Sequence, residues 1–142
     1  MGSTFVDVEA ENLFDIEMRQ ARRDPKRKVR RESVRALVDT GSALFCLPKS
    51  TIARLGLHLA GSTKVRTGNG EVERRIYRPA LITILGRHCH AEVMEVPDGL
   101  PPLVGFIPLE SLDLVVDPKS GRVIPNPEHG GRHTLDLLSS WF

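Results

Sequence analysis

The sequence has little of what marks a secreted or membrane-spanning protein. Its two cysteines, Cys46 and Cys89, allow at most one disulfide, and Cys46 lies in an apolar stretch that suits a reduced thiol in a core. No stretch approaches the roughly 18 apolar residues of a membrane span, and the first residues carry regularly spaced acids in place of the apolar region of a signal peptide. These absences predict a cytoplasmic protein with no membrane partner.

Aromatic residues are also scarce, at 5% of the chain. The 40% of hydrophobic and 27% of charged residues are nevertheless the composition of a globular protein, not of a disordered one. A chain of 142 residues can bury a core without disulfides or metals to brace it. We expect one domain over residues 1–142, with a core at about residues 4–117 and a C-terminal extension at residues 118–142.

The formal net charge of +2 is unevenly distributed. Eight basic residues and one acid lie between Arg19 and Arg31, which leaves 12 basic and 17 acidic residues elsewhere. Such a cluster suits a nucleic acid or an acidic partner. Because no aromatic platform accompanies it, we favour a solvated loop between strands and do not expect nucleic acid as a partner. An exposed basic loop is also a good cleavage target for cellular proteases.

Alternation of apolar and polar residues predicts a mostly β protein. In Thr4–Glu11 the residues Val6, Val8 and Ala10 fall on one face, which is the period of a half-buried strand. Asn69-Gly70 predicts a two-residue hairpin turn, since both positions of such a turn need positive φ. Further strands are expected at residues 13–19, 33–39, 63–68, 71–77, 112–116 and 122–127, with a second hairpin around Gly86-Arg87.

One or two short helices are expected among these strands. Pro48 suits the first turn of a helix and Gly56 the position just past its end, which predicts a helix over about Lys49–Leu55. A brief helical piece is expected near Leu109. The residues from 129 onward fit a helix or a loose tail equally, and Trp141-Phe142 fits a frayed terminus or an apolar tail docked at a subunit interface.

The histidines do not predict a metal site. In a strand, His88 and His90 share one face while Cys89 takes the other, and two ligands are too few for zinc. His129 and His133 have helical spacing, but the two glycines between them oppose a helix. We therefore expect no metal and no organic cofactor.

The stretch ALVDTGSALFCLP, residues 36–48, places one carboxylate in an apolar run, which is costly unless a partner pairs with it or neutralises it. Gly41 lets the backbone approach Asp39 and donate its N–H, Thr40 offers a hydroxyl to brace the loop, and Ser42 offers one to orient the carboxylate. Two such carboxylates held together share one proton. The ionised one can then take a proton from water while the protonated one supports the carbonyl oxygen of a peptide bond.

This stretch resembles the active-site loop of aspartic proteases, in which Asp-Thr/Ser-Gly carries the catalytic carboxylate. Two later stretches extend the resemblance in the order of that family. VRTGNGEVERRIY, residues 65–77, is similar to the flap hairpin of single-domain, retropepsin-like enzymes, and PPLVGFIPLESLDLVVD, residues 101–117, is similar to the segment that closes their fold. The resemblance covers roughly residues 30–117 and is nearest to prokaryotic members. It implies a mostly β, closed barrel-like acid protease fold with a flap hairpin.

The resemblance also implies roles for single residues. Asp39 becomes the catalytic residue of an aspartic endopeptidase that acts on a peptide or protein substrate, with Thr40, Gly41 and Ser42 in support. The flap and substrate-binding residues become Gly68, Asn69, Gly70, Ala43, Phe45, Val104 and Ile107.

The sequence holds one Asp-Thr/Ser-Gly triplet, so two carboxylates require two chains. We therefore expect an obligate homodimer in which a two-fold axis brings Asp39 beside its own copy. Viral enzymes carry an acid where this chain has Ala43 and an arginine where it has Phe106, so the ion pair that helps to stabilise the viral dimer is missing.

Two other functions remain open at this point. One is a catalytically inactive, dimeric module of the same fold that binds extended peptides. The other is a nucleic-acid-binding β-barrel, which predicts salt-sensitive binding through residues 19–31.

Overall fold

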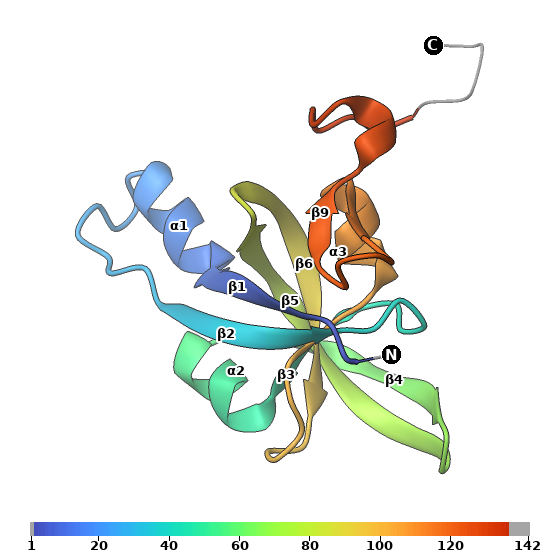
Figure 1. Ribbon diagram of the computed structural model, residues 1–142. Helices are drawn as coiled ribbons and strands as arrows, with labels where there is room; N and C mark the ends of the chain where they lie inside the picture. The colour runs from blue at the N-terminus through green and yellow to red at the C-terminus, as the bar shows by residue number, and fades with distance from the viewer. Residues whose placement is uncertain (1, 137–142) are drawn as a thin grey trace, which may run out of the picture.

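The computed structural model describes residues 2–136 and is mostly β (Figure 1). Its strands are β1 (Phe5–Asn12), β2 (Arg31–Val38), β3 (Phe45–Pro48), β4 (Leu59–Thr67), β5 (Gly70–Ile84), β6 (Arg87–Val96), β7 (Leu103–Val104), β8 (Leu114–Val116) and β9 (Val123–Pro125). Its helices are α1 (Leu13–Gln20), α2 (Lys49–Leu55), α3 (Phe106–Ser111) and the short 3₁₀ helix η1 (Pro127–His129). None of the helices within the described range is long and apolar enough to cross a bilayer.

Six of the strands close into a barrel. The sheet runs β1-β2-β7-β3-β6-β5, and β5 pairs back onto β1, so that Ala10 lies opposite Ile82. The pairs β2–β7 and β3–β6 are parallel and the other pairs are antiparallel. Among the described strands, β4 pairs only with β5, and the two form a hairpin that projects away from the barrel (Figure 1). The predicted closed, barrel-like β fold is confirmed.

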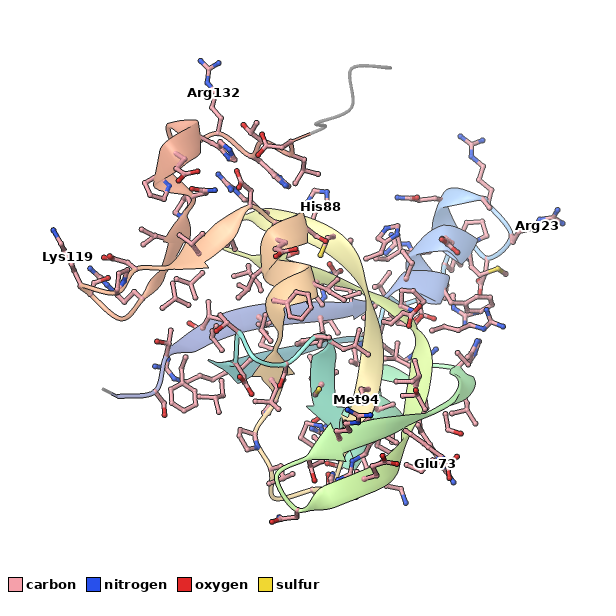
Figure 2. The ribbon with its side chains drawn as sticks, turned by 90° about the vertical axis from the view of Figure 1, so that its right-hand side faces the viewer. Arg23, Glu73, His88, Met94, Lys119 and Arg132 are labelled. Atoms are coloured by element: carbon pink, nitrogen blue, oxygen red, sulfur yellow. The ribbon has the colours of Figure 1, made fainter. Side chains whose placement is uncertain are left out.

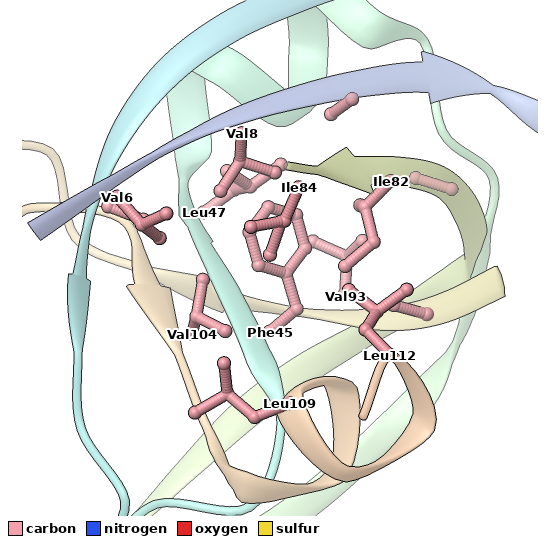
Figure 3. Close-up of a cluster of buried hydrophobic side chains, with 14 of the residues drawn as sticks. Val6, Val8, Phe45, Leu47, Ile82, Ile84, Val93, Val104, Leu109 and Leu112 are labelled. Atoms are coloured by element: carbon pink, nitrogen blue, oxygen red, sulfur yellow. The ribbon is translucent and has the colours of Figure 1, made fainter. Parts of the chain in front are cut away.

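The barrel interior is filled by the inward-facing side chains of the alternating strands (Figure 3). The first strand shows the pattern, since Val6, Val8 and Ala10 are buried while the residues between them are exposed or half-buried, as the sequence predicts. Burial of a large aliphatic or aromatic side chain contributes about 1.5–3 kcal/mol. The largest hydrophobic side chains with almost no exposed surface are Phe45, Leu47, Leu55, Ile82, Ile84, Leu112, Val8, Val93 and Val104.

The predicted helix at residues 49–55 is confirmed as α2. It ends at Gly56, which has φ 66° in the left-handed region that glycine adopts without a Cβ penalty. The helical piece expected near Leu109 is α3.

The prediction of a strand at residues 13–19 is wrong, because these residues form α1. The α-helices among residues 2–136 are therefore three, where one or two were expected. The side chain of Asn12 caps the helix by accepting a hydrogen bond from the Asp15 N–H at 2.9 Å. Such a cap satisfies an amide at the helix start and favours helix over strand at this point.

The basic segment after α1 is only partly the solvated turn that the sequence predicts, and it joins a helix to β2 instead of joining two strands. The carboxylate of Asp15 is completely buried and accepts hydrogen bonds from the guanidinium groups of Arg27, at 2.6 Å, and Arg30, at 3.0 Å. These bonds pin residues 21–30 back onto α1.

Both predicted hairpins are present, with their turns one residue earlier than expected. The β4–β5 turn is Gly68-Asn69, because Thr67 pairs with Gly70. Gly70 alone among these tip residues has positive φ, at 109°, so the predicted Asn69-Gly70 turn with two positive φ angles is wrong. The β5–β6 turn has that geometry instead, at Leu85-Gly86 with φ of 51° and 77°.

The C-terminal segment packs beyond α3. Strand β9 returns on β8, as the sequence predicts for residues 122–127. His129 and His133 do not share a helix, since Gly130 and Gly131 between them both have positive φ. Instead, His129 Nδ1 lies 2.7 Å from the buried carboxylate of Asp113. Trp141-Phe142, for which the sequence leaves a frayed terminus and a docked tail equally open, lie outside the described residues.

Candidate active site

Asp39 lies directly after β2, in the loop that leads to β3. Its backbone N–H donates to the carbonyl of Val104 at 3.0 Å, and the Leu37 N–H donates to the carbonyl of Pro102 at 2.8 Å. These bonds continue the parallel pairing of β2 with β7. The half-buried Asp39 is therefore held at the end of β2, at the rim of the barrel, by the pairing of β2 with β7.

The carboxylate of Asp39 is oriented by its own loop. Oδ1 accepts a hydrogen bond from the Gly41 N–H at 3.0 Å, and Oδ2 accepts one from the Ser42 hydroxyl at 2.8 Å. The Ser42 N–H also donates to the carbonyl of Asp39 at 3.1 Å, which closes a tight turn. Both contacts that the sequence predicts for Gly41 and Ser42 are present, and each oxygen keeps capacity for a further bond.

Thr40 stands apart from this arrangement. It is exposed, and its hydroxyl has no hydrogen-bond partner among residues 2–136. The bracing of the loop expected from Thr40 is therefore not made by any residue of the described range.

The start of α3 is hydrogen-bonded to the backbone of the Asp39 loop. The N–H groups of Phe106 and Ile107 donate to the carbonyls of Ser42, at 2.8 Å, and Ala43, at 3.1 Å. The approach is close enough that a Cβ on Gly105 would lie 2.5 Å from the backbone of residues 42 and 43. Glycine is thus required at position 105 for the helix and the Asp39 loop to touch.

Cys46 follows the loop on β3 and has 1% of its surface exposed. Burial raises the pKa of its thiol to about 11; the negative charge of Asp39 adds to this rise, and the positive charge of Arg74 opposes it. A thiol with this pKa stays protonated at neutral pH and is a poor nucleophile. The chemistry available in this region is therefore that of the carboxylate.

The β4–β5 hairpin projects from the same side of the molecule as the Asp39 loop and α3 (Figure 2). Its tip residues Gly68, Asn69 and Gly70 are exposed, and nothing lies within 4 Å of where a Cβ on either glycine would stand. The tip is braced by the Thr67 hydroxyl, which donates to the Gly70 carbonyl at 2.8 Å.

The four predicted pocket residues are divided by the structure. Ala43 is half-buried beside the Asp39 loop, and Ile107 is 45% exposed at the start of α3. Ile107 lines a cavity of about 300 Å³ together with Leu44, Pro108 and other residues. Phe45 adjoins the same cavity, but Phe45 and Val104 have no exposed surface and belong to the barrel core.

Sequence reasoning missed several charged residues. Asp15 and Asp113 are buried acids whose partners lie 12 to 21 residues away in the sequence, and no local pattern marks those pairings. The sequence predicts only that Arg74 belongs to a hairpin arm, although the alternation of that strand separates Arg74 from Glu73 and Arg75 on the other face. No group of three or more His, Cys, Asp or Glu within residues 2–136 is arranged to hold a metal ion.

Comparison with known proteins bears on this geometry directly. The model of a family described as aspartyl protease matches residues 28–106, which is more than half of the chain. The matched range contains the Asp39 loop, the β4–β5 hairpin and Gly105. No curated protein matches the sequence.

Proposed function

Because the chain belongs to the aspartyl protease family, we propose that it is an aspartic endopeptidase that acts as a homodimer, with Asp39 as the catalytic residue of each subunit. The observation that carries the proposal is the Asp39 carboxylate itself. It stands at the barrel rim, held by Gly41 and Ser42, and each oxygen keeps the capacity to accept a further hydrogen bond from water.

The reaction needs two carboxylates, and each chain supplies one. Two carboxylates within a few ångströms cannot both be ionised, so the pair shares a proton. The ionised group removes a proton from a water molecule, which attacks the carbonyl carbon of the peptide bond. The protonated group hydrogen-bonds the carbonyl oxygen as negative charge develops there, and then supplies the proton that the leaving amine takes up.

A two-fold axis beside Asp39 would also place the exposed groups around it in the subunit interface. Thr40 would face the partner subunit, since it is the immediate neighbour of the residue that meets its own copy. Phe106, 39% exposed, lies at the start of α3 against the same loop. We propose that apolar contacts of such residues replace the missing ion pair.

The substrate would bind as an extended strand across the dimer. Peptides in this form are held by main-chain hydrogen bonds, and alternate side chains enter pockets. The β4–β5 hairpin would serve as the flap, with Gly68, Asn69 and Gly70 at its exposed tip, and Ala43 and Ile107 would provide partly apolar walls. The two free cysteines fit a reducing compartment such as the cytoplasm.

The test compares the wild type with Asp39→Asn on an unfolded protein substrate between about pH 4 and 8. The wild type should cleave, and the variant should lose at least about a thousandfold in rate, because Asn can neither take nor give the proton. Asp7→Asn is the matched control, since its carboxylate is exposed on β1. Equal peptide binding by wild type and Asp39→Asn, with cleavage by neither, would instead favour the inactive peptide-binding module.

A further inference from the structure

The inward face of the β4–β5 hairpin carries apolar residues, two threonines and one charge. Along β5, Val72, Arg74 and Ile76 are half-buried, while the residues at positions 71, 73 and 75 between them are exposed. This alternation places the three side chains on one face of the hairpin. Val65 of β4 pairs with Val72 and shares that face.

That face continues to the Asp39 loop. Ile76 pairs with Met94 of β6, and Met94 pairs with Cys46 of β3, so these three residues form a row across the sheet. Phe45 and Leu47 point into the barrel core, which puts Cys46 between them on the outer side of β3. Cys46 is nevertheless only 1% exposed, so this outer side of β3 is covered as well.

Arg74 lies two residues before Ile76 on the same face of β5, so it belongs to this surface on the side nearer the hairpin tip. Its charge and that of Asp39 both act on the Cys46 thiol, in opposite directions. Figure 2 shows Met94 at the base of the hairpin, below the level of α3. Among residues 2–136 no carboxylate forms an ion pair with Arg74, whereas Arg66 on the exposed face of the same hairpin pairs with Glu71.

We propose that Arg74 is a specificity-determining residue that selects substrates carrying an acidic side chain close to the bond that is cut. This inference rests on the proposed peptidase function and deepens it. A guanidinium binds a carboxylate through two parallel hydrogen bonds. An extended substrate beneath the hairpin would present its alternate side chains to this face, and a Glu or Asp there would supply the partner that Arg74 lacks.

The test uses pairs of peptides that differ only in Glu against Gln at the positions flanking the cleaved bond. Wild type should show a kcat/KM about tenfold higher for the Glu peptide at one of these positions, as for one charged hydrogen-bonded contact. Arg74→Gln should remove this preference by lowering kcat/KM for the Glu peptide. Arg74→Glu should reverse it in favour of a Lys peptide. Arg66→Gln is the matched control, because Arg66 lies on the opposite face of the same hairpin.

The outcomes separate this inference from the proposed function. Cleavage by wild type without an acidic preference, or with a preference that survives Arg74→Gln, would overturn the role of Arg74 and leave the peptidase intact. If neither the wild type nor any variant cleaves, the proposed peptidase function is wrong. Binding of the same peptides, measured by fluorescence anisotropy, then tests whether Arg74 selects an acidic side chain. Tighter binding of the Glu peptide that depends on Arg74 and weakens with salt supports the inference, and equal binding of both peptides contradicts it.

Discussion

At the scale of single residues, the candidate site depends on very close packing between backbone segments. Gly105 touches the backbone of residues 42 and 43, and Gly41 approaches Asp39 so closely that its missing Cβ would lie 3.3 Å from Oδ1. Backbone atoms cannot move aside as the end of a side chain can. The position of the Asp39 carboxylate is therefore set by two glycines as much as by its hydrogen bonds.

Gly105→Ala should lower both stability and activity. The added methyl group would meet backbone atoms at 2.5 Å, and overpacking of this kind costs about 1–3 kcal/mol. Urea unfolding measures the loss, and peptide cleavage measures the displacement of the Asp39 loop. Gly61→Ala, where nothing lies within 4 Å of the new Cβ, should change neither. Equal stability of Gly105→Ala and wild type would show that the loop and α3 are not tightly joined.

Asp39, Gly41 and Ser42 could be predicted from sequence because they are neighbours in the chain and their chemistry is local. Arg74 and the Asp113–His129 pair could not, because their surroundings are created by strands and loops distant in sequence. Phe45 shows the same limit. Its place next to the loop predicts a pocket wall, and Phe45 does adjoin the cavity at Ile107, but the pleat of β3 turns its side chain into the core.

At the scale of elements, α1 and the segment after it form one unit around a buried charge. Burial by itself would raise the pKa of Asp15, but hydrogen bonds from Arg30 and Arg27 outweigh it and hold that pKa well below its ordinary value. The folded-state pKa is depressed, so the contribution to stability is complete above about pH 4 and declines as the pH falls further.

Asp15→Asn should therefore destabilise the protein at pH 7 by about 2 kcal/mol, as for loss of charged hydrogen bonds whose donors can still reach water. The difference from wild type should shrink below about pH 4. Chemical denaturation at several pH values measures both effects. Asp24→Asn is the control, since Asp24 makes a more exposed pair with Arg27 and should matter little. A difference that stays constant with pH would contradict the ion-pair explanation.

The C-terminal segment is joined to the barrel by a second charged pair. Asp113 Oδ2 receives the Thr134 N–H at 3.0 Å and lies 2.7 Å from His129 Nδ1, while Arg87 donates to the carbonyls of Leu112 and Asp113. The hydrogen bond with Asp113 raises the pKa of His129 above its ordinary value. This attachment is therefore fully formed below about pH 6.5 and weakens as the pH rises through the raised pKa.

The titration of His129 followed by NMR should give a pKa above the ordinary histidine value. Asp113→Asn should return it toward that value, because the charged partner is gone. Asp117→Asn is the control in the same segment, as Asp117 caps a separate turn through Ser120. An unshifted pKa in the wild type would mean that the pair does not form in solution.

The helices and hairpins also show which structural features local sequence signals can predict. Residues 13–19 alternate well enough for a strand, and only the cap from Asn12 and the burial of Asp15 by later arginines favour the helix. Helix α2 was predictable because both of its boundary signals, Pro48 and Gly56, are local. The glycines at the two turns predict both hairpins. The position of each turn depends on strand pairing, which is not local, and the predicted turns are therefore off by one residue.

At the scale of the whole molecule, the barrel closes within one chain, whereas the proposed active site needs a second chain. The contact between β1 and β5 closes the sheet, so the fold needs no partner to finish its hydrogen-bonded ladder. The site has one carboxylate at the rim, and a peptidase of this kind needs two. The central claim is therefore that two chains share one active site.

The most direct test of that claim measures the activity of a fixed amount of wild-type protein refolded together with increasing amounts of the Asp39→Asn chain. Each mixed dimer has one carboxylate, so activity should fall to about half when the two chains are equal in amount, and further as the variant is added in excess. Adding Asp7→Asn should not reduce it. Activity that stays the same at every ratio of Asp39→Asn to wild type would show that one chain holds the whole active site, and would contradict the shared site.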